Sequence, residues 1–216
     1  MKSYRTLMLA TLLGASMTLP VLAGNGGPGK GPGVGALPQI DPNEAATLSF
    51  MREEEKLARD VYLDMNDLWD AVVFVNIAAS EQQHMDTLLQ LLDKYGLPDP
   101  AASDIPGWFS DQNLQTLYDD LVNRGQASYA EALQVGALIE EVDIEDLQLA
   151  IEETDNADLQ NAYDNLMRGS RNHLRAFVAE IERTGVVYEA QHLDQTIVDA
   201  ILDGPVERGG SSKKRN

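Results

Sequence analysis

The stretch NIAASEQQHM (residues 76–85) contains a Glu-x-x-His motif formed by Glu81 and His84. Residues three apart are neighbours on the surface of an α-helix, so these two side chains can converge on one metal ion. Apolar residues recur with helical spacing on both sides of the motif, within about 40° of His84 around the helix axis: Val73, Ile77, Leu88, Leu91 and Tyr95. The motif therefore lies on the buried face of a helix predicted over about residues 73–95, where polar side chains need partners.

The segment before this helix supplies a first partner. Asp41-Pro42-Asn43-Glu44 combines an N-cap residue, a proline at the first helical position and a glutamate three residues after the cap, which together predict the start of a helix. In an antiparallel hairpin, residues equally far from the turn lie level with each other. Glu55 and Glu81 are each 13 positions from Leu68, in the predicted turn. We expect Glu55 to share a metal ion with Glu81, although periodicity leaves Glu54 as an alternative.

The second half of the chain repeats this arrangement after a long connection. Residues 97–127 contain several prolines and one short amphipathic helix, predicted over 112–123. A capping box at Ser128 then opens a third helix, with Glu140 on its buried stripe, and a fourth helix over about 157–184 has His173 on its stripe. The predicted fold is all-α, an antiparallel four-helix bundle over residues 41–203 with a long crossover between the second and third helices and a short extra helix in that crossover.

The two ends of the chain differ in composition from the predicted bundle. Residues 1–23 have a basic start, an apolar run and a small-x-small ending, which predict a signal peptide and an exported protein, periplasmic or extracellular. Residues 24–40 are rich in Gly and Pro and are predicted to form a flexible tether, and residues 204–216 are predicted to form a disordered basic tail. No later stretch is long and apolar enough to predict membrane insertion after signal cleavage.

Composition narrows the chemistry. The chain has no cysteine, which excludes disulfides, thiolate metal ligands and a cysteine nucleophile, so any metal must be bound through oxygen and nitrogen. Its 35 acidic and 16 basic residues give a formal net charge of −19. That charge attracts cations and argues against nucleic acid as a partner.

Four blocks of sequence resemble a known family: FMREEEKLARDVY (50–62), NIAASEQQHM (76–85), ALQVGALIEEVDIEDL (132–147) and GSRNHLRAF (169–177). In this order they make about residues 45–205 similar to the uncharacterised DUF2202 family, which is assigned to the ferritin-like superfamily. The first two blocks resemble the first half of a ferritin-like or rubrerythrin-like di-iron protein. The resemblance implies a ferritin-like bundle that binds iron, with manganese as a second candidate.

Ferritin-like proteins hold two metal ions with one Glu from each of two helices and a Glu-x-x-His motif from each of the other two. Carried over position by position, the resemblance implies five metal ligands: Glu55, Glu81, His84, Glu140 and His173. One carboxylate of the pattern is missing, because Ser170 stands where the second motif would have its glutamate. Asp143 or Glu141 could supplement Glu140, and a mononuclear site or an unequal metal pair also stays open.

Other polar and aromatic residues near the predicted site are interpreted more simply. Tyr62 and Tyr163 each lie seven positions from a site position, where packing is favoured over a role as hydrogen-bond donor or redox-active group. His192 follows the predicted bundle and is expected at the surface.

Three functions are consistent with this pattern. The first is an exported ferritin-like metalloprotein that activates dioxygen or reduces peroxide, an oxidoreductase of the di-iron type with unassigned catalytic residues. The second is a non-catalytic metal-binding or storage module, and the third is a structural helical domain with a vestigial site. Metal ions are the expected partners, and a homodimer is a candidate assembly.

Overall fold

The computed structural model describes residues 37–208 and contains six α-helices and no strands within that range. The predicted signal peptide, residues 24–36 of the predicted tether and residues 209–216 of the predicted tail lie outside the described residues. The helices are α2 (Pro42–Trp69), α3 (Val72–Tyr95), α4 (Gln112–Gly125), α5 (Tyr129–Glu152), α6 (Ala157–Arg183) and α7 (Gln195–Asp203). The all-α prediction is confirmed, and the four long helices pack as a bundle.

Local sequence explains where the long helices begin. Asp41 accepts a hydrogen bond from the backbone of Asn43, and Glu44 bonds back to the Asp41 backbone, so the predicted capping box opens α2. Ser128 caps α5 by accepting from the Glu131 backbone. These interactions satisfy amide groups that have no partner inside the helix.

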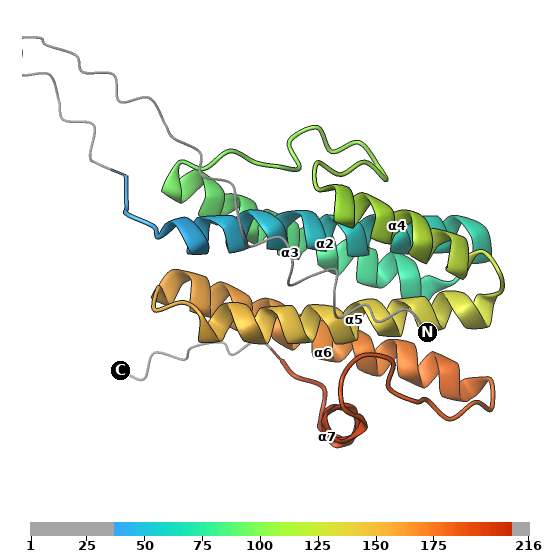
Figure 1. Ribbon diagram of the computed structural model, residues 1–216. Helices are drawn as coiled ribbons and strands as arrows, with labels where there is room; N and C mark the ends of the chain where they lie inside the picture. The colour runs from blue at the N-terminus through green and yellow to red at the C-terminus, as the bar shows by residue number, and fades with distance from the viewer. Residues whose placement is uncertain (1–36, 209–216) are drawn as a thin grey trace, which may run out of the picture.

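The long helices form two hairpins that face each other (Figure 1). A tight turn at Asp70 joins α2 to α3, and residues 153–156 join α5 to α6. The chain leaves α3 at one end of the bundle, passes back along its length through α4, and enters α5 at the other end, so α3 and α5 run in the same direction (Figure 1). This path places the buried stripes of all four helices around one axis.

Residues of the crossover cover a second face of α2, where several charged side chains of α2 are buried. Lys56, 1% exposed, donates to the Asp60 carboxylate at 2.5 Å and to the Ile105 carbonyl at 2.8 Å. The Asp60 carboxylate also accepts from the Gly107 backbone at 3.0 Å, and Arg59 donates to Asp104 at 2.6 Å. Because each buried charge has partners, these contacts attach residues 104–108 to α2 without leaving isolated charges in the interior.

The C-terminal segment docks on the second hairpin and contains a helix that the sequence did not predict, α7. The buried Glu141 carboxylate accepts hydrogen bonds from the Tyr188 hydroxyl and from the backbone of residues 191–193. Beyond α7, Glu207 bonds to Arg171 at 2.6 Å and to Arg175 at 3.2 Å. Residues 204–208, assigned to the tail from sequence, therefore lie against α6.

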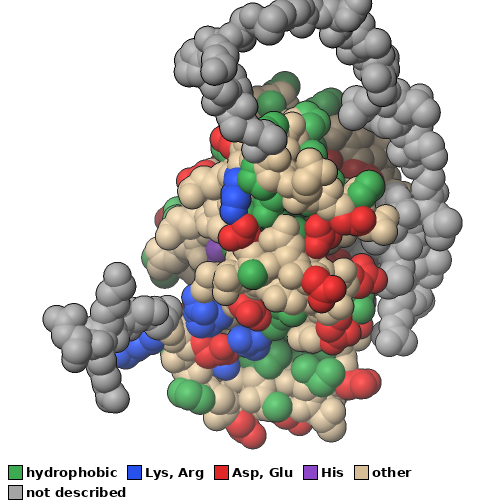
Figure 2. All heavy atoms as spheres, turned by 90° about the vertical axis from the view of Figure 1, so that its left-hand side faces the viewer, with side chains coloured by type: hydrophobic (Ala, Val, Ile, Leu, Met, Phe, Trp, Pro, Cys, Tyr) green, Lys and Arg blue, Asp and Glu red, His purple; other side chains and the backbone are tan. Residues whose placement is uncertain are grey.

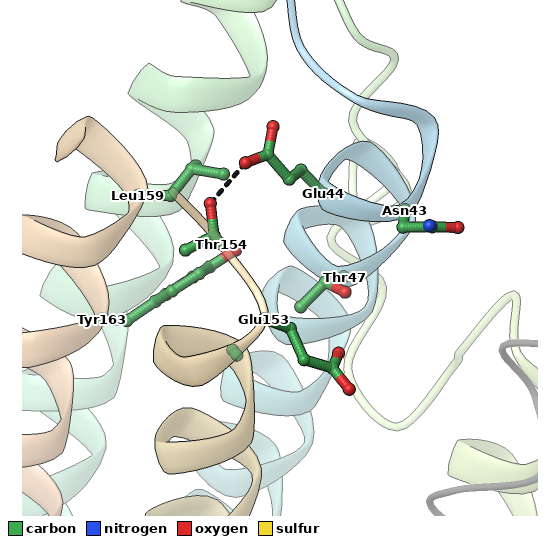
Figure 3. Close-up of a pocket in the computed structure, with 8 residues that line it drawn as sticks. Asn43, Glu44, Thr47, Glu153, Thr154, Leu159 and Tyr163 are labelled. Atoms are coloured by element: carbon green, nitrogen blue, oxygen red, sulfur yellow. Dashed lines mark hydrogen bonds between the residues drawn. The ribbon is translucent and has the colours of Figure 1, made fainter. Parts of the chain in front are cut away.

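One end of the bundle contains a small cavity of about 20 Å³, where the start of α2 meets the turn between α5 and α6 (Figure 3). The Thr154 hydroxyl donates to Glu44 across it, and Tyr163 lines it. Tyr163 is ten positions before His173 on α6, about 15 Å along the helix, so it belongs to this end of the bundle.

The surface reflects the acidic composition. On the face shown in Figure 2, acidic side chains are spread over much of the molecule, whereas basic side chains gather on one side. Within residues 37–208, no helix has the length and apolar character needed to cross a membrane.

Candidate metal centre

Four helices each direct carboxylate or imidazole groups to one place in the bundle interior. These groups are at most 8% exposed, and they are the five predicted ligands: Glu55 on α2, Glu81 and His84 on α3, Glu140 on α5 and His173 on α6. They form two groups in which the ligand atoms lie within 4.8 Å of one another. Each group has the composition of a cation site, with two carboxylates and one imidazole.

The first group joins the two helices of the first hairpin. His84 Nδ1 lies 2.7 Å from Glu81 Oε2 and 3.2 Å from Glu55 Oε2. The hairpin register accounts for this meeting, because Glu55 and Glu81 were predicted to be level and His84 lies one turn beyond Glu81.

The second group joins the two hairpins. His173 Nδ1 lies 2.8 Å from Glu81 Oε1 and 3.4 Å from Glu140 Oε2. Glu81 thus belongs to both groups and presents one carboxylate oxygen to each histidine. The two imidazole rings lie 5.6 Å apart between centroids, at an interplanar angle of 31°.

The spacing of these atoms fits a metal ion. Ligand atoms about 2.1 Å from a common ion and roughly at right angles are about 3 Å apart, which matches the range from 2.7 to 3.4 Å found here. Glu55 Oε1, Glu81 Oε1 and His173 Nδ1 have no aligned hydrogen-bond partner among the described residues, although they are buried. The two carboxylate oxygens can accept a cation, and His173 Nδ1 can do so once it has lost its proton.

Burial and mutual attraction set the charges of this cluster. Burial raises the pKa of Glu55 to about 7, although His84 partly offsets this effect. Burial would raise the pKa of Glu81 as well, but the adjacent His173 and His84 lower it below its ordinary value. Burial would lower the pKa of His173, but Glu81 and Glu140 raise it to about 10. Without metal, protonated imidazoles therefore balance the buried carboxylates, and a metal ion would replace those protons.

Neighbouring residues orient the two imidazoles differently. His173 Nε2 lies 2.9 Å from Ser80 Oγ, which holds the ring with Nδ1 toward the carboxylates. The His84 ring packs on Gly169, where a Cβ atom would come within 2.5 Å of His84 Nε2. Gly169 therefore leaves space for His84, a requirement that the sequence analysis did not identify.

Two further contacts support the carboxylates. The Tyr62 hydroxyl donates to Glu140 Oε1 at 2.5 Å, so Tyr62 contacts the predicted site as well as packing in the core. Ser170, at the position of the missing glutamate, donates to Asp143 Oδ2. Asp143 is close enough to Glu55, Glu140 and Glu81 for their charges to raise its pKa, in addition to the larger effect of burial.

The structure separates the residues that periodicity left as alternatives. Glu55, not Glu54, meets His84, while Glu54 lies among Asp143 and Asp146. Glu141 points away from the two groups and anchors the C-terminal segment. His192 is not a surface residue as expected, because its side chain is 7% exposed and bonds to Glu145 at 2.6 Å.

Comparison with known proteins finds a matching family and a similar protein, and neither description names a function. The model of the family described as "Uncharacterized protein domain (DUF2202)" matches residues 44–205. The chain is 46% identical over 178 residues to "Uncharacterized protein MJ0754" of Methanocaldococcus jannaschii, covering 82% of this chain and 96% of that protein. The crystal structure of that hypothetical protein MJ0754 superposes with a TM-score of 0.77, covering 80% of this chain and 99% of the other.

Proposed function

The chain belongs to the DUF2202 family, and we propose that it is an exported ferritin-like metalloprotein that binds a pair of iron or manganese ions and reacts with dioxygen or peroxide. The observation that carries the proposal is the sharing of Glu81 between two buried Glu/His groups. Ferritin-like di-iron and di-manganese proteins hold their metals with inward-facing Glu and Glu-x-x-His side chains from four helices, and the two groups here come from four helices in the same way. Mixed carboxylate and imidazole ligands suit both metals.

The ligand roles follow from the positions of the residues. Glu55 and His84 would hold one ion and Glu140 and His173 the other, with Glu81 between them. Asp143, held by Ser170, supplies the acid that the second Glu-x-x-His motif lacks, so the carboxylates of Glu55, Glu81, Glu140 and Asp143 can balance two divalent ions. The bound metals would supply one-electron redox chemistry toward oxygen or peroxide.

The remaining contacts keep the protein groups in place. Ser80 accepts from His173 Nε2 when Nδ1 is free for the metal, which sets the imidazole tautomer. Tyr62 donates to Glu140 and orients its second oxygen toward His173. Burial excludes bulk water from the carboxylates, which strengthens their attraction for a cation.

Anaerobic titration with Fe(II), followed by air or hydrogen peroxide, tests the proposal. We expect two ions per chain at the Glu/His groups and rapid, repeated turnover with an added electron donor. Slow oxidation of the bound iron, once only, would favour a storage module instead. Absence of both Fe(II) and Mn(II) binding would contradict the proposal and favour the third candidate, a structural helical domain with a vestigial site.

Export is a separate part of the proposal and rests on the order of charged, apolar and small residues in positions 1–23. We expect the mature protein to begin near Gly24. Mass spectrometry of native material would refute export by signal cleavage if Met1–Ala23 were retained.

A further inference from the structure

Tyr163 on α6 has a buried hydroxyl group without a hydrogen-bond partner among residues 37–208. The residue is only 1% exposed, so bulk water does not solvate this hydroxyl. A buried hydroxyl that makes no hydrogen bond is costly, and in native proteins most such groups bond to another protein group or to an ordered water. The Tyr163 hydroxyl therefore needs a partner that the surrounding protein groups do not supply.

Tyr163 lines the small cavity at the end of the bundle, and its ring points from α6 toward Thr154 (Figure 3). The cavity has a volume of about 20 Å³, which is enough for one water molecule. Apart from Ala150 and Leu159, the other lining residues are polar and none of them is basic: Asn43, Glu44, Thr47, Glu153 and Thr154. A cavity of this size with a polar lining holds a water molecule, whereas an apolar one stays empty.

Glu44 supplies an acceptor at this cavity. Its Oε1 accepts a hydrogen bond from the Thr154 hydroxyl, and its Oε2 accepts from the Asp41 backbone at 3.0 Å. Each carboxylate oxygen has two lone pairs, so Glu44 can accept further hydrogen bonds. Burial raises the pKa of Tyr163, and the charge of Glu44 raises it further, yet the Tyr163 hydroxyl does not bond to Glu44. The two groups are therefore neighbours with a gap between them.

The Tyr163 hydroxyl distinguishes water from a cation of similar size. The hydroxyl has one proton to donate, and a metal ion cannot accept it. A water molecule accepts that proton in a hydrogen bond and can donate its own two protons to the oxygen atoms of the lining.

We propose that this cavity is a binding site for one water molecule, which accepts a hydrogen bond from Tyr163 and donates one to Glu44. The water joins α6 of the second hairpin to the first turn of α2 in the first hairpin, beside the direct bond between Thr154 and Glu44. The site is independent of the proposed metal centre, because Tyr163 lies about 15 Å along α6 from His173.

The change in melting temperature caused by Tyr163→Phe tests the proposal. If the hydroxyl donates to a bound water, its removal breaks a hydrogen bond, and we expect the melting temperature of the full, metal-free chain to fall by about 2–4 °C. Tyr129→Phe, which removes a hydroxyl from a half-buried side chain outside the cavity, is the matched control and should leave it nearly unchanged. An equal or higher melting temperature in Tyr163→Phe would overturn the proposal, because it would mean that the buried hydroxyl has no partner.

A high-resolution crystal structure of the full chain tests the identity of the ligand. We expect one peak of electron density in the cavity, about 2.8 Å from the Tyr163 hydroxyl and from a Glu44 carboxylate oxygen. A cavity without density would overturn the proposal. A peak closer than about 2.5 Å to several oxygen atoms, as for a bound metal ion, would overturn it as well.

Discussion

The two hairpins of the bundle contribute unequally to the candidate metal centre. The first, α2 and α3, provides three ligands with a complete Glu-x-x-His motif, whereas the second, α5 and α6, provides Glu140 and His173. In the second hairpin, Ser170 replaces an acid on α6 and Asp143 on α5 lies next to it. Under the proposed function, Asp143 on α5 takes the place of the glutamate that α6 lacks, so the charge at the centre is kept although the acid comes from the neighbouring helix.

Removing either imidazole should cause the largest loss of metal affinity. It should also show whether binding needs ligands from both hairpins. We expect His84→Ala and His173→Ala each to weaken Fe(II) or Co(II) binding by more than about a hundredfold, since loss of a ligand costs more than loss of an orienting contact. His192→Ala should leave the affinity unchanged, because His192 bonds to Glu145 away from the centre. Equal affinities in all three variants, measured under argon, would identify the inward histidines as packing residues.

Gly169→Ala disturbs the contact between Gly169 on α6 and the His84 ring on α3, through which the second hairpin positions a ligand of the first. The added Cβ would come within 2.5 Å of His84 Nε2 but only within 3.7 Å of His173 Cε1, so it should displace the His84 ring selectively. We expect a loss of about ten- to a hundredfold in metal affinity, as for other disturbed ligand orientations. The matched control is the same change in a His84→Ala background, where it should cost almost nothing. A similar loss in both backgrounds would point to a general disturbance of α6.

Asp143→Asn and Ser170→Ala test whether Asp143 takes the place of the glutamate that α6 lacks. The first removes a charge beside the centre and should weaken binding of the second metal ion by about tenfold, whereas the second removes only a hydrogen bond to that charge and should have a severalfold effect. Calorimetric titration with Co(II) can separate the two binding steps. Larger loss in Ser170→Ala than in Asp143→Asn would contradict the assigned roles.

The stability of the metal-free protein should depend on pH, through Glu55 of the first hairpin in one pH range and through His173 of the second hairpin in another. Glu55 has a folded-state pKa of about 7, above its ordinary 4.5, and His173 has one of about 10, above its ordinary 6.5. Both groups hold a proton more tightly when folded, so stability falls as pH rises, from 4.5 to 7 through Glu55 and from 6.5 to 10 through His173.

We expect the melting temperature of the metal-free chain to fall by several degrees between pH 6 and pH 9, at roughly 2–4 °C per kcal/mol. Saturation with Mn(II) should remove this fall, because the ion replaces the protons. Thermal unfolding followed by circular dichroism provides the measurement. A melting temperature that rises over this pH range would mean that the cluster is ionised differently.

Local signals in the sequence were enough to predict the bundle. The Asp41-Pro42-Glu44 start of α2, the Ser128 cap of α5 and the crossover helix near residues 112–123 all depend on neighbours within one turn, and the structure contains each of them. Phase and distance from the turn were also enough to bring Glu55 level with Glu81, because both are properties of a single hairpin. The approach of His173 to Glu81 depends on how the two hairpins pack, and the full set of five ligands came from the family resemblance.

Contacts between distant segments could not be predicted in the same way. Lys56 and Arg59 look like the solvated face of an amphipathic helix, but the crossover covers that face. Periodicity could not separate Glu54 from Glu55, because the boundary between their environments depends on where α5 packs. The short helix α7 follows Asp194, a residue type favoured at N-caps, but that side chain makes no capping hydrogen bond and the helix has only nine residues, so the local signal was weak.

Glu81 has one further consequence, because it is the residue common to both ligand groups. An ion that arrives first draws on the negative charge of Glu81 and changes the field met by the next ion. If two ions bind as proposed, their binding is coupled, and by thermodynamic linkage each ion alters the affinity of the other by the same factor. The sign of that coupling depends on whether the first ion repels the second more strongly than it prepares the ligands for it. A single carboxylate thus makes two half-sites from different hairpins respond as one unit.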